Sequence, residues 1–167
     1  MRETATHYFF WKHQFGQWTL RDIVDTDGTV YNCCEQYMMV KKALLFNDKV
    51  MAENILKELN PSKQQQLGRK VSGYNQDLWD QYKIGIVWYA NYLKFMQHRD
   101  LKQRLLETED KVLVEASPTD LVWGVGLLAE DDKILITSNW KGQNHLGNIL
   151  MQVRDALKMI KVQPIRV

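Results

Sequence analysis

Glu35 is a carboxylate in a stretch otherwise suited to burial, Asn-Cys-Cys-Glu-Gln-Tyr-Met-Met at residues 32–39. On a helix, this carboxylate shares a face with Met38, Met39 and Lys42, which follow it by three, four and seven positions. A carboxylate on a partly apolar face is costly unless it is paired with a cation or protonated. Glu35 is therefore a candidate acid–base group. The more common alternative is a structural charge, which faces the helix N-terminus or pairs with Lys42.

A second carboxylate, Asp120, lies in the turn-rich segment Ser-Pro-Thr-Asp-Leu-Val-Trp-Gly-Val-Gly at residues 117–126. It follows an expected strand that ends at Ala116, and it precedes Trp123 and Gly124. Binding sites are often built in this way, because glycine lets a ligand approach the backbone closely. The alternative is that Asp120 only caps a turn, and the pattern does not decide between the two.

Three further features could bind a substrate that carries a base and a phosphate. Trp79 could provide a surface on which a base stacks, although most tryptophans belong to the core. Arg69 could bind a phosphate through two parallel hydrogen bonds, and the alternative is a solvent-exposed charge. The loop at residues 140–147, which contains Asn144, could offer backbone N–H groups to an anion, although turn geometry alone also explains its glycines.

Several familiar catalytic patterns are absent from the sequence. It contains neither GxxxxGK[ST] nor GxGxxG, which bind nucleotides, and it has no GxSxG nucleophile motif. Its only cysteines, Cys33 and Cys34, lack the spacing of zinc ligands, and so do its scattered histidines. The chemistry that remains most open is that of a carboxylate enzyme, for which we expect no metal and no cofactor.

The elements that must position these residues are mostly helical, with a few short strands. Apolar spacing and capping residues predict helices over residues 33–46, 49–59, 61–68, 75–97, 101–108 and 148–160. Asp48, Asn60 and Asp100 are the expected N-caps of three of them. In the longest helix, Trp79 and Lys83 lie on the same side because they are four residues apart.

The β structure is expected to be small. Residues 111–116 read as a short buried strand. Residues 8–31 are rich in aromatic side chains and are expected to be irregular, apart from a turn at residues 25–28 between two short apolar runs.

Length and composition predict a single compact domain over residues 1–167. A net charge of +2 is too small to indicate a nucleic-acid-binding protein, but it does not exclude a phosphorylated small molecule. No signal peptide or membrane span is recognisable, and two adjacent cysteines suit a reducing compartment, so we expect a cytoplasmic protein.

Taken in order, these stretches resemble the NADAR superfamily of YbiA-like N-glycosidases. The resemblance extends over about residues 9–158 and is carried by five stretches, at residues 35–48, 67–71, 78–95, 105–126 and 140–154. Each stretch alone is weakly specific, and their common order makes a coincidental match improbable. One departure is Gly16, which stands where the family often has a serine.

The resemblance implies a mostly α-helical fold and hydrolysis of an N-glycosidic bond without a metal. It also implies one of two substrate classes, namely ADP-ribose attached to a nucleobase such as guanine or ribosylamino-pyrimidine phosphates of riboflavin biosynthesis. The motif carboxylates and tryptophan of the family fall on Glu35, Asp120 and Trp79. Such a substrate is a small nucleotide or ADP-ribosylated nucleic acid, and no membrane or obligate protein partner is expected.

These residues suggest a division of roles. Glu35 is the first choice for the base or the group that stabilises positive charge on the sugar, and Asp120 for the ribose hydroxyls or the water, although the two could be exchanged. Trp79 would stack on the base, and Arg69 with Lys42 or Lys83 would bind phosphate. Trp123, Gly124 and Asn144 complete the candidate binding residues. The alternatives are a non-catalytic module that binds ADP-ribose and a purely structural helical domain.

Overall fold

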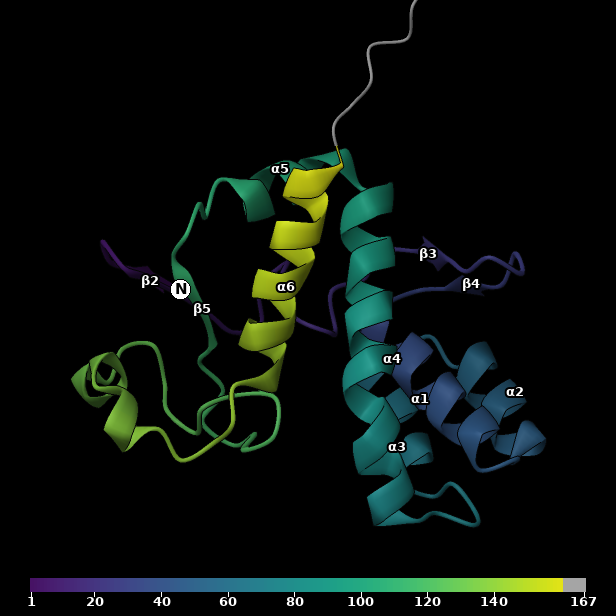
Figure 1. The fold of residues 1–167 in the computed structure, drawn as a ribbon. Helices are drawn as coiled ribbons and strands as arrows, with labels where there is room; N and C mark the ends of the chain where they lie inside the picture. The colour runs from purple at the N-terminus through teal and green to yellow at the C-terminus, as the bar shows by residue number, and fades with distance from the viewer. Residues whose placement is uncertain (161–167) are drawn as a thin grey trace, which may run out of the picture.

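Within residues 1–160, which this computed structural model describes, six α-helices make up nearly half of the chain (Figure 1). Residues 161–167 of the predicted 1–167 domain lie outside the described residues. The mostly helical class with a few short strands is thereby confirmed. The helices are α1 (Cys34–Leu45), α2 (Lys49–Lys57), α3 (Pro61–Gly68), α4 (Gln76–Gln97), α5 (Arg99–Leu106) and α6 (His145–Met159).

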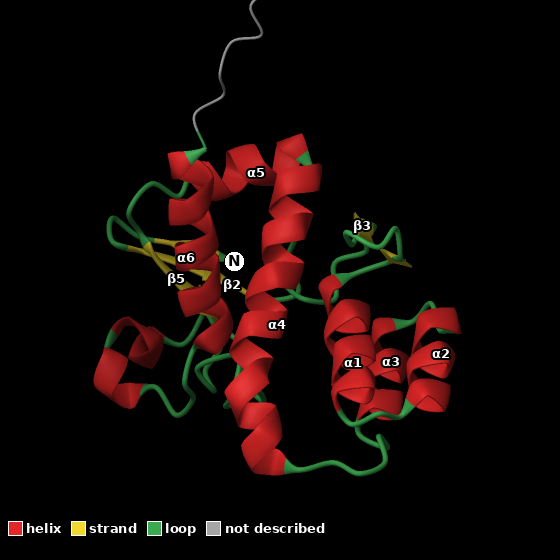
Figure 2. Ribbon diagram, turned by 45° about the vertical axis from the view of Figure 1, so that its right-hand side comes forward, coloured by secondary structure: helices red, strands yellow, loops and turns green. Residues whose placement is uncertain are grey.

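The long helix α4 is the central element of the fold. Helix α1 packs against α4, and α2 and α3 pack against α1, so these three form a helical group on one side of α4 (Figure 2). On the other side α4 packs against α6, and α6 packs against the strand β5 (Val112–Glu115). Helix α5 contacts both α4 and α6. A side chain on α4 can therefore contribute to both halves of the molecule.

Two of the predicted N-caps are confirmed. The carboxylate of Asp48 accepts the backbone N–H of Met51 at 3.0 Å at the start of α2. The side-chain oxygen of Asn60 accepts the backbone N–H of Lys63 at 3.2 Å at the start of α3. These bonds satisfy donors that have no partner inside the helix.

The start of two other helices differs from the prediction. Asp100 is not an N-cap, because it lies in the first turn of α5, where its carboxylate accepts Arg21 Nη2 at 2.9 Å. Helix α6 begins at His145 rather than at residue 148, because Asn144 adopts a left-handed conformation with φ 52° and ends the preceding loop there. Capping residues thus identify a helix more reliably than they fix its first residue.

The strands form two small sheets. In the first, β2 (His7–Phe10) lies between β1 (Arg2–Glu3), to which it is antiparallel, and β5, to which it is parallel. The second is a hairpin of β3 (Ile23–Val24) and β4 (Val30–Tyr31), which encloses the predicted turn. The predicted strand at residues 111–116 is confirmed as β5.

Strand β2 corrects the prediction that residues 8–31 are irregular. Its pairing partner β5 is distant in the sequence, and both of its faces are buried, so it shows no alternation of apolar and polar residues. Phe10 belongs to the main core, whereas Phe9 belongs to a smaller cluster with residues of the segment after β5. The register pairs Phe10 with Glu115, which places the end of β5 beside the loop that follows β2.

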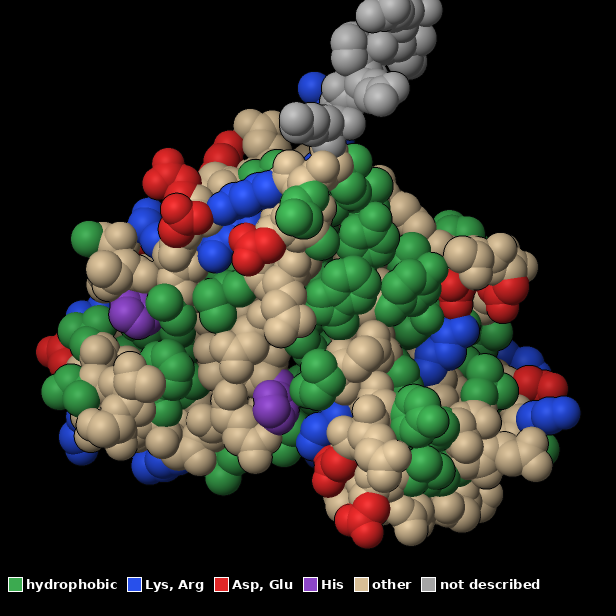
Figure 3. All heavy atoms as spheres, in the orientation of Figure 1, with side chains coloured by type: hydrophobic (Ala, Val, Ile, Leu, Met, Phe, Trp, Pro, Cys, Tyr) green, Lys and Arg blue, Asp and Glu red, His purple; other side chains and the backbone are tan. Residues whose placement is uncertain are grey.

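Exposed apolar side chains occur on many elements, and on one face of the molecule they gather over the central helix. Figure 3 shows hydrophobic side chains gathered over the upper part of α4. In this helix the rings of Trp88 and Tyr92 are stacked, with their centroids 5.2 Å apart. Cys33 and Cys34 are both buried and free. In the described part of the chain, none of the helices has the length and apolar character that crossing a membrane requires.

Candidate active site

A cleft of about 1060 Å³ collects most of the predicted site residues. Its walls come from the loop after β2, from α1 and α3, from the N-terminal half of α4 and from the segment after β5. The predicted residues that line it are Glu35, Arg69, Trp79, Lys83, Asp120 and Trp123. The structure therefore brings together side chains from four regions that are far apart in the sequence.

Glu35 lies in the first turn of α1 and is only 2% exposed. Its Oε1 has no hydrogen-bond partner among the described residues. Burial raises the pKa of Glu35 to about 8; the negative charge of Asp120 adds to the increase, whereas the Trp18 indole and the cations Arg69 and Lys42 oppose it. Glu35 is therefore a carboxyl group that holds a proton at neutral pH inside the cleft.

Asp120 uses one carboxylate oxygen to order the segment after β5. Its Oδ1 accepts the backbone N–H of Val122 at 2.9 Å and that of Trp123 at 2.7 Å. Its own N–H donates to Ser117 Oγ at 3.2 Å. The two readings of Asp120 are thus compatible, because the residue caps a turn while its side chain also lines the cleft.

Glu115, at the end of β5, is a cleft residue that we did not single out in the sequence. It is 8% exposed, and its Oε2 has no hydrogen-bond partner in the described structure. Burial raises the pKa of Glu115 to about 8, Asp120 adds to this increase and Lys94 opposes it. The signal in the sequence was a carboxylate that ends the otherwise apolar strand Val-Leu-Val-Glu.

Aromatic side chains line much of the cleft. Trp79 of α4 is 8% exposed, so that it belongs to the core as well as to the cleft, and Trp123 is half-buried. Three aromatic residues that we did not predict also line it, namely Trp11, Trp18 and Tyr74. Trp18 is 47% exposed, which leaves much of its ring free to contact a ligand.

Basic side chains lie among these aromatic rings. Arg69 and Lys83 line the cleft as predicted, and Lys12 is a third cation there. Lys42 does not line the cleft. It lies behind the wall, where its Nζ is 4.3 Å from the ring centre of Tyr74 and 5.5 Å from that of Trp79. Lys42 can therefore act on the cleft through these rings and through its charge.

Two of the predicted binding residues stand behind the cleft wall instead of lining it. Asn144 is buried; its Oδ1 accepts the N–H of Glu115 at 3.0 Å and its Nδ2 donates to the carbonyl of Leu113 at 2.9 Å. Gly124 is also buried, and a Cβ there would lie 2.9 Å from the carbonyl oxygen of Glu115 and 3.0 Å from Cβ of Ser117. Both residues hold the end of β5 in place, and neither presents a side chain to a ligand.

A buried lysine fixes the loop that follows β2. Nζ of Lys94, on α4, donates to the carbonyl oxygens of Phe15 at 3.4 Å and Gly16 at 3.1 Å. Burial lowers the pKa of Lys94. A Cβ at Gly16, the position where the family often has serine, would lie 3.1 Å from the carbonyl oxygen of His13. The loop is therefore held closely against α4 beside the cleft.

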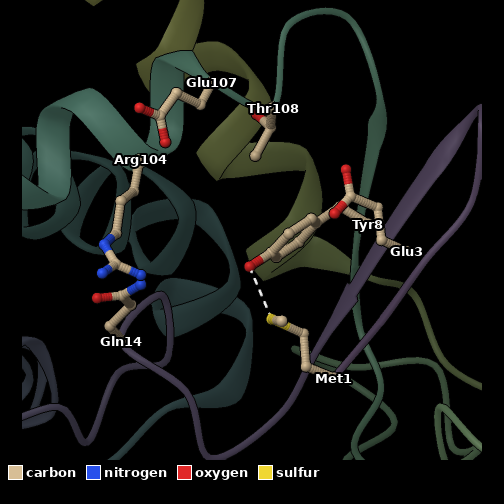
Figure 4. A pocket seen from close by; sticks show the side chains of 7 residues that line it. All are labelled: Met1, Glu3, Tyr8, Gln14, Arg104, Glu107 and Thr108. Atoms are coloured by element: carbon tan, nitrogen blue, oxygen red, sulfur yellow. Dashed lines mark hydrogen bonds between the residues drawn. The ribbon is translucent and has the colours of Figure 1, made fainter.

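A smaller hollow of about 240 Å³ lies between the N-terminal residues and α5. Figure 4 shows Arg104 and Glu107 on one side of it and Tyr8 on the other, where the Tyr8 O–H donates to Met1 Sδ at 2.9 Å. Its charged groups are exposed, in contrast to the buried carboxyl groups of the cleft. Among residues 1–160, no group of three or more His, Cys, Asp and Glu side chains is arranged to hold a metal ion.

Known proteins are similar to this chain over most of its length. The NADAR domain family model matches residues 2–158. A protein of Acanthamoeba polyphaga mimivirus named as an N-glycosidase is 41% identical over 147 residues, 86% of each chain. One of Nostoc punctiforme with the same type of name is 33% identical over 135 residues, 81% of this chain and 80% of that protein. The NMR structure of Escherichia coli YbiA matches with a TM-score of 0.73 and 26% identity, and the match covers 93% of this chain and 88% of that one.

Proposed function

This chain belongs to the NADAR domain family and is an enzyme of the N-glycosidase class, and from that premise we propose that it hydrolyses the bond between C1′ of a ribose and a nitrogen of a nucleobase. The observation that carries the proposal is the meeting of buried carboxyl groups with aromatic and basic side chains in one cleft. Aromatic rings suit a base, cations suit phosphate, and carboxyl groups suit acid–base chemistry at the sugar.

The reaction requires two carboxyl groups with different roles, one negatively charged and one that donates a proton. As the C1′–N bond breaks, the nitrogen takes the electron pair and positive charge develops on the sugar. A negative group near the sugar stabilises that charge, and a proton donor neutralises the departing nitrogen. Asp120 suits the first role, because two backbone N–H groups hold its Oδ1 in place in the wall of the cleft. Glu35 suits the second role, because with its pKa raised to about 8 it carries a proton at neutral pH.

This division exchanges the roles that the sequence favoured for Glu35 and Asp120. The reason is their surroundings. Glu35 is almost fully buried, which stabilises the neutral form of the carboxyl group, whereas Asp120 is partly exposed and hydrogen-bonded. Glu35 also lies near Lys42, which contacts the ring of Trp79, so the proton donor is on the side where a base would stack.

For the substrate we favour a nucleobase that carries ADP-ribose. Such a substrate has two bases and two phosphates, whereas a ribosylamino-pyrimidine phosphate has one of each. The volume of the cleft, about 1060 Å³, exceeds what a mononucleotide needs. Its aromatic residues lie on several elements, and so do its cations, which are Lys12, Arg69 and Lys83. These features support the larger substrate.

The test is a direct comparison of the two substrate classes. The protein is incubated with ADP-ribosylated guanosine and, separately, with a ribosylamino-pyrimidine phosphate. Chromatography then measures the guanosine released from the first and the free pyrimidine released from the second. We expect release of guanosine together with ADP-ribose from the first. Faster cleavage of the second would contradict the choice of substrate but not the reaction. Saturable binding with no product from either would contradict hydrolysis and support a binding module.

A further inference from the structure

Glu115 is a third carboxyl group of the cleft, and the reaction described above gives it no role. Its side chain is 8% exposed, and Oε2 lacks a hydrogen-bond partner within the described residues. A buried polar atom without a partner costs free energy, so its presence calls for an explanation. A residue needed only for packing at the end of β5 would be apolar, as Leu113 and Val114 are.

The backbone on either side of Glu115 is firmly held. Its N–H donates to Asn144 Oδ1 at 3.0 Å, and its carbonyl oxygen accepts the N–H of Val125 at 3.0 Å. On β2, Phe10 is its partner in the parallel register. A side chain on such a rigid strand end has a well-defined position in the cleft, which is what a catalytic group requires.

The charged groups that face Glu115 are Asp120 and Lys94. Lys94 comes from α4, but its Nζ is bound to the backbone carbonyls of the loop after β2 instead of to the carboxyl group. Phe10 on β2 is paired with Glu115, and Asn144, the residue before α6, accepts its N–H; neither carries a charge. Burial and the nearby Asp120 raise the pKa of Glu115 to about 8, so Glu115 is protonated at neutral pH.

We propose that Glu115 and Asp120 act as an acid–carboxylate pair that holds the water molecule attacking C1′. This proposal rests on the proposed hydrolysis. The protonated Glu115 donates its O–H to one lone pair of the water, which directs the other lone pair at C1′. As the new C1′–O bond forms, Asp120 takes a proton from the water. The C1′–N bond breaks, and its electron pair goes to the nitrogen, which receives the proton of Glu35. Exchange with solvent then returns a proton to Glu35 and removes one from Asp120.

The proposal is tested with two substitutions at one position, using ADP-ribosylated guanosine as substrate. Glu115→Gln keeps an uncharged group with a donor and an acceptor, so we expect kcat within about tenfold of the wild type. Glu115→Leu keeps the approximate size and removes both, and we expect kcat to fall by on the order of 10²-fold with little change in KM. Glu53→Gln, on the exposed surface of α2, is the control and should leave kcat unchanged.

The pH profile distinguishes catalysis from a structural role. In the wild type both Glu35 and Glu115 must be protonated, so the logarithm of kcat should fall with a slope approaching −2 above about pH 8. In Glu115→Gln only Glu35 titrates, and the slope should be −1. An unchanged slope would overturn the proposal.

Three other outcomes would also count against the pair. A folded Glu115→Leu variant with wild-type kcat would show that Glu115 does not hold the water. If Glu115→Gln is as inactive as Glu115→Leu, although circular dichroism shows that both fold, the protonated form is not the active one. Absence of hydrolysis by the wild type would overturn the proposed function and the pair together, whereas the variant results overturn the pair alone.

Discussion

At the scale of single residues, the cleft is unusual in holding two carboxyl groups that favour the protonated form. Glu35 and Glu115 are both buried, both have an oxygen without a partner in the described structure, and Asp120 acts on both. Perturbed carboxyl groups are common where acid–base chemistry occurs, because burial brings an acid close to neutral pH. The same burial predicts a measurable effect on catalysis and a separate effect on stability.

The catalytic prediction concerns Glu35. Glu35→Gln keeps the shape of the side chain but removes the proton that the departing base needs. We expect kcat to fall by on the order of 10²-fold or more with a small change in KM. Steady-state release of guanosine from the ADP-ribosylated nucleoside measures this. Turnover close to that of the wild type would exclude Glu35 as the proton donor.

The stability prediction concerns pH. The folded-state pKa of both buried glutamates is about 8, above the ordinary value of 4.5, so between these values the folded protein binds more protons than the unfolded chain. Stability from these groups is therefore complete below about pH 4.5 and is lost as the pH rises through about 8.

We therefore expect the free energy of unfolding, measured with urea, to fall between about pH 6 and pH 8.5 in the wild type. The Glu35→Gln, Glu115→Gln double variant should lose most of this fall, whereas Glu53→Gln, which changes an exposed glutamate, should keep it. The same pH dependence in the double variant and the wild type would show that these carboxyl groups are not buried in neutral form.

The sequence identifies a site residue when its polarity differs clearly from that of its neighbours in the chain. Glu35 and Asp120 stand out because a carboxylate interrupts an apolar helix face or precedes an aromatic and glycine. Glu115 stands out less from its neighbours, because polar residues commonly end a strand. Only the tertiary structure shows that this strand end is buried. Gly124 and Asn144 have properties that suit a ligand and the end of a strand equally well. Glycine allows another backbone to approach closely, and the side chain of asparagine can form several hydrogen bonds. The sequence alone therefore does not tell which of the two they contact.

At the scale of elements, helix α4 carries residues of the cleft and of the core, and it contains one evident weak point. Gly85 lies in its interior and is exposed, and a Cβ placed there would have no atom within 4 Å. Glycine is the least favourable residue other than proline inside a helix, by about 1 kcal/mol relative to alanine. We expect Gly85→Ala to raise the free energy of unfolding by roughly 0.4–1 kcal/mol, as measured by urea denaturation, without changing kcat.

Gly147, in the first turn of α6, is a helical glycine at which a larger side chain has no space. A Cβ there would meet the carbonyl oxygen of Leu113 and the side chain of Asn144. Because Leu113 is part of β5 and Asn144 is hydrogen-bonded to it, neither can move away easily. Gly147→Ala should therefore lower the free energy of unfolding, whereas Gly85→Ala raises it. If both substitutions shift stability in the same direction, helix propensity does not explain the effect at Gly85.

A helix or strand can be predicted from the sequence when the residues that determine it lie within or next to it. Helices α2, α3 and α4 have capping asparagine or aspartate residues and apolar spacing within the helix, so their positions follow from neighbouring residues. Strand β2 has no such signal, since its partner β5 is distant and both of its faces are buried. Trp11 and Trp18, in the loop that β2 leads into, are consequently among the cleft residues that the sequence did not indicate.

At the scale of the whole molecule, the cleft exists because the α1–α3 group and the sheet with α6 lie on opposite sides of α4 (Figure 2). A ligand in it contacts both halves at once. If the substrate carries ADP-ribose, then ADP-ribose is the sugar product and should bind across the cleft through its adenine and both phosphates. Ribose 5-phosphate could make only part of these contacts.

We therefore expect the Kd of ADP-ribose, measured by calorimetry, to be at least about fivefold lower than that of ribose 5-phosphate, since one additional stacked base is worth about 1–3 kcal/mol. At a free ADP-ribose concentration of about 100 times its Kd, the folded state gains about 2.7 kcal/mol. For a chain of this size, that gain should raise Tm by roughly 5–10 °C.

Two matched aromatic variants locate the binding surface. Trp18 is 47% exposed and lines the cleft, whereas Tyr82 is 50% exposed and is not among the cleft residues. Because both side chains are half exposed, their removal should perturb folding to a similar, small degree. Trp18→Ala should weaken ADP-ribose binding while Tyr82→Ala leaves it unchanged. Two results would contradict this: equal Kd values for ADP-ribose and ribose 5-phosphate, or equal ADP-ribose binding by the two variants. Either would mean that the ligand occupies only the part of the cleft that contains the carboxyl groups, and the smaller substrate class would then be favoured.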